Sequence, residues 1–531
     1  MRSESFKCSL DFFILPGLIL LIAYVPNFAG GEVSYYEDGG YLSVINRLFH
    51  GAWYYRDICA NYAPLTYSLP AAAMMMFGKT LLTLKVCFLA SNILSLIVIY
   101  AISRVLIRRR FFSYLAALLI VVHAHHPYFS MHWGGFRFLF GYLFLLCVVI
   151  FQRTKDKEHA FLAGLSAALA ALSSADVGLF CYGATVSLVL YQRHLKRLGS
   201  PQRFAWAVHF LSGSLSLLLP FFAVLFFSGS LRPFVREIFS FGARFVLIQP
   251  VDWSSRSALK VFTVPIIYFI AWIGLFNGRA RNAIPEDEAR SLTVLAFYGS
   301  ATFIFSFRAL AGPQFENALP AAYLTAFYLL STLRGTTRSK RFFSAVVVSG
   351  AIVFLSLSQN MIYGGRHAWR RWWFYQTHKN EWVPHYWQIQ NDPMRPLKPA
   401  IARAKGSLVP VYQASEIEEV VSWVRQNSRP DEPLFCFPEL DIFNFLCDRP
   451  QISRFYFAGY ALSKPEWREE LFAGLVREKP RIVLTQNVVP VLAGLTGERE
   501  VLPEIRNYIL THYEKVHTAH TIDIYKLKAT I

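Results

Sequence analysis

The chain has 531 residues, of which 54% are hydrophobic and only 16% are charged, and its mean hydropathy is +0.34. Because soluble domains carry about a quarter charged residues, this composition excludes an ordinary soluble protein and predicts a polytopic α-helical membrane protein. The net charge of +19 is typical of Lys and Arg gathered in cytoplasmic loops, so it does not indicate nucleic acid as a partner. Seven cysteines without a CxxC pair give no indication of a zinc or thioredoxin-like site.

The first predicted element is the apolar run from Leu10 to Phe28. Arg2 and Lys7 precede it, so we expect an uncleaved membrane anchor whose N-terminus lies in the cytoplasm. A cleaved signal peptide, with Ala29 at the small-residue position, is the alternative.

A long outer loop, residues 31–79, follows this anchor and is rich in acids, aromatic residues and glycine. Long connections between packed elements tend to be functional. Glu37 and Asp38 lie just outside the first span, where a carboxylate can take a proton from the hydroxyl of a nearby substrate. Partial burial makes such a carboxylate a better base. The alternative is that Asp38 serves only as the N-cap of a short helix.

Apolar runs then alternate with charged loops through the first two thirds of the chain. With the anchor they predict eleven membrane spans, the other ten being residues 80–102, 111–128, 134–151, 160–175, 177–191, 205–228, 259–276, 291–307, 315–333 and 342–361. Asp176, at the tight turn between two short spans, is expected to cap a helix. The most basic loops fall inside under this count, which puts the C-terminus outside.

Two further predicted outer loops contain candidate binding residues. The loop at residues 123–132 holds His123, His125, His126 and His132, without HExxH spacing and without a nearby carboxylate, so no metal site is predicted. The loop at residues 229–257 holds four arginines, against the tendency of basic residues to stay inside. They indicate either a site for an anionic phosphate or a basic amphipathic helix on anionic head groups.

The last third of the chain has a different character. Residues 362–409 are basic and aromatic, as expected of an interfacial linker. Residues 410–531 predict a soluble α/β domain outside the cytoplasm, with helices at 415–427, 440–446, 469–478 and 505–513 and strands at 433–437, 481–484 and 521–526. Cys436 and Cys447 could form a disulfide there, and both states remain open.

The first outer loop resembles that of a known superfamily. The ordered phrases are Asp38-Gly39-Gly40-Tyr41, His50-Gly51, Tyr54-Tyr55-Arg56-Asp57, Ala63-Pro64-Leu65 with Tyr67, and Phe77-Gly78. This pattern resembles the GT-C membrane glycosyltransferases, and within them the branch of the protein O-mannosyltransferases and lipid A aminoarabinose transferases. The stretch from Phe307 to Pro320 is also similar to the superfamily, although Asn317 stands where His is frequent.

The resemblance implies a fold and a reaction. Residues 1–361 are expected to form a GT-C transmembrane domain with a catalytic first outer loop. The enzyme is expected to move a sugar from a polyprenyl-phosphate donor to a hydroxyl of a lipid, glycan or protein acceptor, with inversion, on the outer face of the membrane. Membrane lipids are further partners, no cofactor is required, and a divalent cation is possible. A bacterial inner membrane is favoured because the chain has no Asn-x-Ser/Thr sequon.

The resemblance also assigns roles to residues of this chain. Asp38 is the expected general base, and Glu37 is the alternative because the family often has the two acids in the opposite order. Asp57 is expected to orient the acceptor or support the base. The expected phosphate-binding residues are Arg56, Arg137, Arg244 and Arg308. The expected cavity residues are Tyr41, Tyr55, Tyr62, Glu316 and Asn317.

Two other classes of function remain open at this point. A polyprenyl-lipid transporter or flippase also needs many spans, but transporters place charges near the middle of the membrane, whereas the acids here cluster in outer loops. A non-catalytic membrane assembly subunit would keep the fold and tolerate the loss of Asp38.

Overall fold

The computed structural model divides the chain into two compact units. One comprises Met1–Asn27, Phe88–Phe221 and Ile248–Arg370, and the other comprises Phe28–Cys87, Phe222–Leu247 and Arg371–Ile531. The structure describes residues 33–35, 37–59, 62–107, 110–123, 129–194, 200–244, 258–277, 284–306, 318–332, 396–397, 399–405, 409–455, 464–487 and 502–529, together with 17, 348, 350, 458 and 461.

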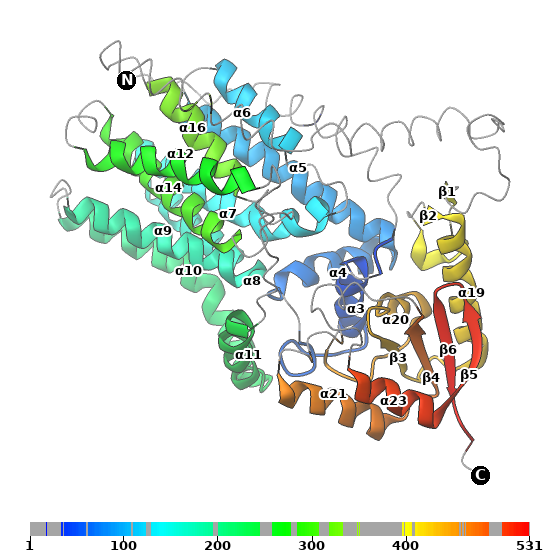
Figure 1. Cartoon of the computed structure of the whole chain (residues 1–531). Coiled ribbons are helices and arrows are strands. Elements are labelled where there is room, and N and C mark those ends of the chain that lie inside the picture. Colours follow the sequence, from blue (N-terminus) through cyan, green and yellow to red (C-terminus); the bar gives the residue numbers. More distant parts are fainter. Residues whose placement is uncertain are drawn as a thin grey trace, which may run out of the picture. The chain divides into compact units, whose positions relative to one another are not determined.

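The first unit is helical, as predicted for the membrane part. Its helices are α6 (Arg110–His123), α7 (Phe129–Thr154), α8 (Lys157–Ser173), α9 (Ala175–His194), α12 (Ala258–Phe276), α14 (Glu286–Ser306), α16 (Leu319–Thr332), and most of α5 (Leu81–Leu106) and α10 (Ser200–Phe227) (Figure 1). Among the described residues, three helices are long and apolar enough to cross a membrane: α5, Phe136–Thr154 of α7 and Trp206–Phe227 of α10. The predicted count of eleven spans remains a prediction, since the runs at 10–28 and 342–361 lie almost wholly outside the described residues.

Small residues let two of these helices approach closely. A Cβ atom on Gly164 of α8 would collide with the carbonyl oxygen of Phe210, and one on Gly213 of α10 would collide with that of Phe161. The hydroxyl of Ser214 donates a hydrogen bond to the carbonyl of Gly164 over 3.0 Å. Apolar helices gain stability in a membrane through such close packing and interhelical hydrogen bonds rather than through hydrophobic burial.

The second unit combines the segment predicted to be the first outer loop with residues 222–247 and the C-terminal part of the chain. Its helices are α3 (Glu37–Phe49), α4 (Leu65–Phe77), α11 (Leu231–Arg244), the 3₁₀ turn η3 (Ala402–Ala404), α19 (Val411–Asn427), α20 (Ile442–Cys447), α21 (Pro465–Glu478) and α23 (Pro503–His512). Its strands are β1 (Pro396–Leu397), β2 (Val409–Pro410), β3 (Leu434–Phe437), β4 (Ile482–Gln486), β5 (Tyr513–Ala519) and β6 (Ile522–Leu527).

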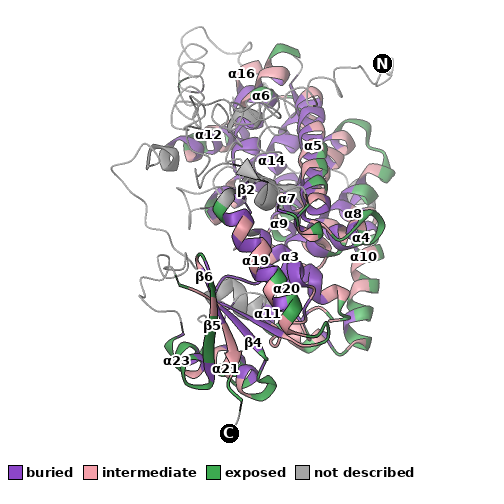
Figure 2. Cartoon of the chain, turned by 90° about the vertical axis from the view of Figure 1, so that its right-hand side faces the viewer, coloured by how far each residue is buried: buried purple, intermediate pink, exposed green. Residues whose placement is uncertain are grey.

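Four of these strands form one sheet in the order β3-β4-β6-β5 (Figure 1). Strand β3 runs parallel to β4, and β6 runs antiparallel to both of its neighbours. The predicted helices and the three predicted strands of this region are confirmed. Strand β5 was not predicted, because the sequence indicated only one strand, at residues 521–526, after the helix at 505–513. Figure 2 shows β5 as a largely exposed edge, whereas the first residues of β4 are buried.

Polar contacts join the outer loop to the C-terminal segment. The amide of Asn46 on α3 donates to the carbonyl of Arg449 over 3.0 Å, and helix α3 packs against α20. The backbone N–H of Cys59 donates to the carbonyl of Arg454 over 2.8 Å. The guanidinium of Arg454 in turn forms ion pairs with Glu237 of α11 and with Glu470 of α21. Three segments far apart in the sequence therefore form one compact unit.

The two cysteines for which a disulfide had stayed open are both free. Cys436 lies on β3 and Cys447 ends α20, and both thiols are buried. Burial raises the pKa of the Cys447 thiol to about 12, so it stays protonated and unreactive near neutral pH.

We expect the α8–α10 contact to be intolerant of a single added methyl group. Gly213→Ala should lower the apparent thermal midpoint of the purified protein in detergent, because overpacking a close contact costs about 1–3 kcal/mol. The matched control is Gly274→Ala on α12, where a Cβ meets nothing within 4 Å, and which should leave the midpoint unchanged or raise it. Equal midpoints for the two variants would show that α8 and α10 do not approach this closely.

Candidate active site

Asp38 is the most buried of the predicted acids that the structure describes. Helix α3 begins at Glu37, so Asp38 lies inside its first turn and not at the N-cap position itself. Only 2% of its surface is exposed. Its Oδ2 accepts a hydrogen bond from the backbone N–H of Ser34 over 3.0 Å. A carboxylate in the first helical turn is also stabilised by the positive end of the helix dipole.

A positive charge accompanies Asp38. Lys85, in the second turn of α5, is buried, and its ammonium group interacts electrostatically with the Asp38 carboxylate. Sequence reasoning missed this residue, although an ionisable side chain inside an apolar span is a signal for function. Asp38 and Lys85 thus place a carboxylate and an ammonium group together in a region with little solvent.

Tyrosines line the same part of the outer loop. Tyr41, one turn after Asp38, stacks on Tyr62 with ring centroids 6.0 Å apart and contacts Tyr67 at 5.4 Å. Tyr41 and Tyr67 are buried. The structure therefore brings the predicted cavity residues Tyr41 and Tyr62 together. Tyr55 packs edge-on against Phe234 of α11, with ring centroids 4.9 Å apart. It joins the same cluster through Tyr54, whose ring lies 5.9 Å from that of Tyr55 and 6.1 Å from that of Tyr67.

Asp57 and Arg56 form a local pair on an exposed turn. Arg56 donates from Nε to Oδ1 of Asp57 over 2.9 Å and from its terminal nitrogen to Oδ2 over 2.7 Å. The backbone N–H of Trp53 adds a third bond to Asp57, at 2.9 Å. The hydrogen bond from Arg56 holds the pKa of the Asp57 carboxyl below its usual value. These bonds close the turn, and they pair the charge of Arg56 with that of Asp57.

Arg137 lies in the other unit, on α7, and is engaged by neighbouring residues there. It forms a buried ion pair with Asp176 and donates from Nε to the hydroxyl of Ser174 over 3.1 Å. Asp176 lies in the first turn of α9 rather than at its N-cap, and it accepts the backbone N–H of Val177 over 2.9 Å. The ion pair with Arg137 was not expected from the sequence.

The remaining predicted residues are beyond what the structure describes. Arg308, Glu316 and Asn317 lie outside the described residues, and so do the side chains of Glu37 and Arg244. The histidines between residues 123 and 132 are likewise not described at the side-chain level. Among the side chains that are described, no group of three or more His, Cys, Asp or Glu could hold a metal ion.

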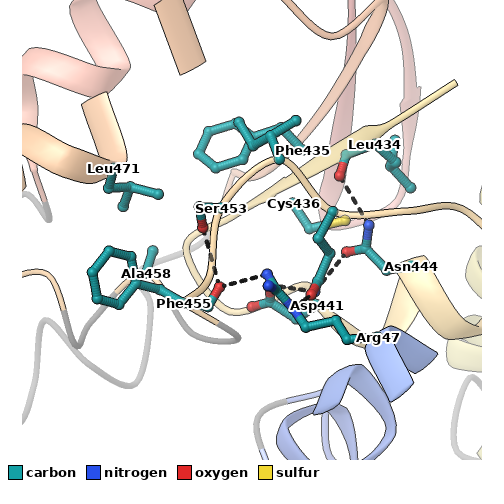
Figure 3. Close-up of a pocket in the computed structure, with 12 residues that line it drawn as sticks. Arg47, Leu434, Phe435, Cys436, Asp441, Asn444, Ser453, Phe455, Ala458 and Leu471 are labelled. Atoms are coloured by element: carbon teal, nitrogen blue, oxygen red, sulfur yellow. Dashed lines mark hydrogen bonds between the residues drawn. The ribbon is translucent and has the colours of Figure 1, made fainter. Parts of the chain in front are cut away.

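A second polar cluster surrounds a small cavity between α3 and the C-terminal segment (Figure 3). Arg47 of α3 donates to the carbonyl of Phe455 over 3.2 Å and to the side chain of Gln451. Gln451 donates to Oδ1 of Asp441 over 3.3 Å. The cavity has a volume of about 10 Å³, enough for about one water molecule. It is too small for a sugar or a lipid phosphate, so we do not assign it as the active site.

Comparisons with known proteins give a match in structure but not in sequence. No protein-family model matches the chain, and no curated protein matches it in sequence. The fold is similar to the crystal structure of ArnT from Cupriavidus metallidurans bound to undecaprenyl phosphate, which is 13% identical, with 97% of this chain and 98% of that chain covered and a TM-score of 0.53. The apo form of the same protein gives 14% identity, coverages of 96% and 97%, and a TM-score of 0.53.

This similarity extends over the whole of both chains. At this level of identity, the similarity shows that the chain shares the fold of ArnT. The long apolar helices and the composition of the chain are those of an integral membrane protein.

The cluster around Asp441 should make the second unit less stable as the pH rises. Burial raises the pKa of the Asp441 carboxyl well above its ordinary value, although the Arg47 charge opposes this. The folded state therefore retains a proton on Asp441 that the unfolded state releases. The contribution of Asp441 to folding stability is fully present below about pH 4 and is lost as the pH rises through the raised pKa of the folded state. In a thermal unfolding assay over a range of about pH 5 to pH 9, the apparent midpoint should decline less with rising pH in Asp441→Asn than in the wild type.

The control for this prediction is Asp431→Asn, because Asp431 is largely exposed and pairs only loosely with Arg429 over 3.6 Å. It should leave the pH dependence of the midpoint as in the wild type. A slope in Asp441→Asn as steep as that of the wild type would contradict the assignment of a buried, protonated carboxyl.

Proposed function

We propose that this chain is an integral-membrane glycosyltransferase that moves a sugar from a polyprenyl-phosphate donor to a hydroxyl of a lipid, glycan or protein acceptor. The observation that carries the proposal is the buried pair of Asp38 and Lys85 beside the tyrosines of the first outer loop. The fold likeness to ArnT, whose structure holds undecaprenyl phosphate, supports this reaction class.

The proposed reaction is a single displacement at the anomeric carbon. Asp38 takes the proton of the acceptor hydroxyl, and the acceptor oxygen forms a bond to the anomeric carbon while the bond to the lipid phosphate oxygen breaks. The phosphate leaves with the electron pair, and the configuration inverts. Glu37 remains the alternative base, because its place in the sequence next to Asp38 fits the same role.

Positive charges would stabilise the leaving phosphate. Lys85 is a candidate because its ammonium already interacts with Asp38, and charge that develops in a poorly solvated site is stabilised strongly by a fixed cation. Arg56, Arg137, Arg244 and Arg308 remain proposed phosphate-binding residues. For Arg56 and Arg137 this role requires that the phosphate replace or join their present partners, Asp57 and Asp176.

The other cavity roles and the topology belong to the same proposal. Tyr41, Tyr55 and Tyr62 would contact the substrate, as would Glu316 and Asn317. Asp57 would orient the acceptor through its turn. We propose eleven spans, a cytoplasmic N-terminus, an interfacial linker at 362–409 and an outer C-terminal domain at 410–531, in a bacterial inner membrane. A divalent cation is not required by this scheme.

The decisive experiment measures release of free polyprenyl phosphate by purified protein in detergent, with a panel of polyprenyl-phosphate sugars and an envelope extract as the acceptor source. We expect release by the wild type and a loss of about 10²–10⁴-fold in Asp38→Asn, which is the range for removal of a general base. Retained activity in Asp38→Asn with loss in Glu37→Gln would transfer the base role to Glu37. Binding of polyprenyl phosphate without release from any donor would favour a lipid transporter, and retained activity in both variants would remove the acid-base mechanism.

Lys85 gives a second test of the same site. Lys85→Met should weaken binding of polyprenyl phosphate about 10–100-fold, because a charged hydrogen bond contributes about 1.5–3 kcal/mol. Lys85→Arg keeps the charge and should lose less, and Lys79→Met, which removes a cation stacked on Phe49 at 4.2 Å, is the matched control outside the site. The measurement is equilibrium binding of polyprenyl phosphate by isothermal titration calorimetry, and wild-type affinity in Lys85→Met would exclude this residue from the phosphate site.

A further inference from the structure

The residues just before α3 form a short strap, which we define as Val33, Ser34 and Tyr35. The strap contacts the proposed base directly. Besides the bond from the Ser34 N–H to Oδ2 of Asp38, the carbonyl of Ser34 accepts the N–H of Asp38 over 3.0 Å and that of Gly39 over 3.3 Å. The position of the strap therefore determines where a backbone donor meets the Asp38 carboxylate.

Helix α19 of the C-terminal segment holds this strap on both sides of Ser34. The amide of Gln413 donates to the carbonyl of Val33 over 2.7 Å. The hydroxyl of Tyr35 donates to Oε1 of Glu416 over 2.7 Å. Gln413 and Glu416 are three residues apart and so lie on the same face of the helix. Both side chains are buried.

Glu416 is itself anchored to the sheet. Its Oε2 accepts both the backbone N–H and the hydroxyl of Thr521, each over 2.6 Å. Thr521 lies in the turn between β5 and β6. The carboxylate therefore connects the strap to the hairpin at the far end of the sequence, and its two oxygens are committed to separate partners.

Tyr35 is also fixed as a hydrogen-bond donor. Its ring packs edge-on against Phe443 of α20, with ring centroids 5.4 Å apart. Burial, with the nearby Glu416 carboxylate, raises the pKa of the Tyr35 hydroxyl well above its usual value. The hydroxyl therefore keeps its proton and donates to Glu416 across the accessible pH range.

From these contacts we propose that the C-terminal segment positions the catalytic carboxylate through Gln413, Glu416 and Tyr35, which act as positioning residues for Asp38. The proposal rests on the proposed function in assigning Asp38 as the base. It gives the C-terminal segment a role in the chemical step, because a base must be held within hydrogen-bond reach of the proton it abstracts. None of the three positioning side chains needs to touch the substrate.

The test compares Tyr35→Phe and Gln413→Leu with the wild type. Tyr35→Phe removes one hydrogen bond and retains the ring against Phe443, and Gln413→Leu removes the bond to Val33. Each should lower kcat about tenfold, equivalent to about 1.4 kcal/mol, with the KM for the donor unchanged. Tyr508→Phe on α23, whose ring stacks on His512 at 4.1 Å, is the matched control and should keep wild-type kinetics.

Two further measurements separate the possible outcomes. Hydrogen exchange of the peptide that contains Ser34 should be slow in the wild type and faster in both variants, and this readout does not depend on activity. A wild type that releases no polyprenyl phosphate would overturn the proposed function alone, and slow exchange in both variants would overturn the strap contacts. Faster exchange with unchanged kcat, or a raised KM in place of a lowered kcat, would overturn the positioning role.

Discussion

The burial of the Asp38 carboxylate is the constraint on which the rest of the second unit depends. Taking a charged group out of water costs several kcal/mol unless opposite charge and hydrogen-bond donors replace the lost hydration. Here the replacements come from different segments: the N–H of Ser34 from the strap, the charge of Lys85 from α5 and the dipole of α3 itself. The segment that precedes α5 therefore folds around this group and is not a loose connection.

The same requirement extends along α3. Asn46 and Arg47 are buried polar residues on this helix, and buried polar groups in folded proteins are almost always hydrogen-bonded. Most of their partners are carbonyls and side chains between residues 444 and 455, some 400 positions away in the sequence. A helix of 13 residues has little stability of its own in water, so the C-terminal segment supplies much of what keeps α3 in place.

The sequence predicts the parts of this structure that depend on local patterns. Apolar runs located helices such as α5 and α14, and alternation located β3, β4 and β6. Strand β5 was missed because Tyr-Glu-Lys-Val-His-Thr-Ala is exposed over most of its length, so burial leaves no clear signal. Lys85 was missed because one cation hardly lowers the hydropathy of a long apolar run. The partners of Arg47 could not be found from the sequence, since they lie in a segment hundreds of residues away. The proximity of Lys85 to Asp38 depends on how the start of α5 folds against α3, which no local pattern encodes.

The two aspartates of the segment that precedes α5 have different surroundings, which bears on the proposal that Asp38 is the base. Both oxygens of Asp57 already accept hydrogen bonds from Arg56, and a depressed pKa makes a carboxylate a weaker proton acceptor. Asp38 is shielded from water, and a base in such a site acts on the hydroxyl placed beside it while bulk water has little access. Under the proposed function that protection matters, because water would otherwise compete with the acceptor for the activated sugar. If Asp38 is the base, burying its carboxylate costs free energy of folding but also limits hydrolysis of the donor by water.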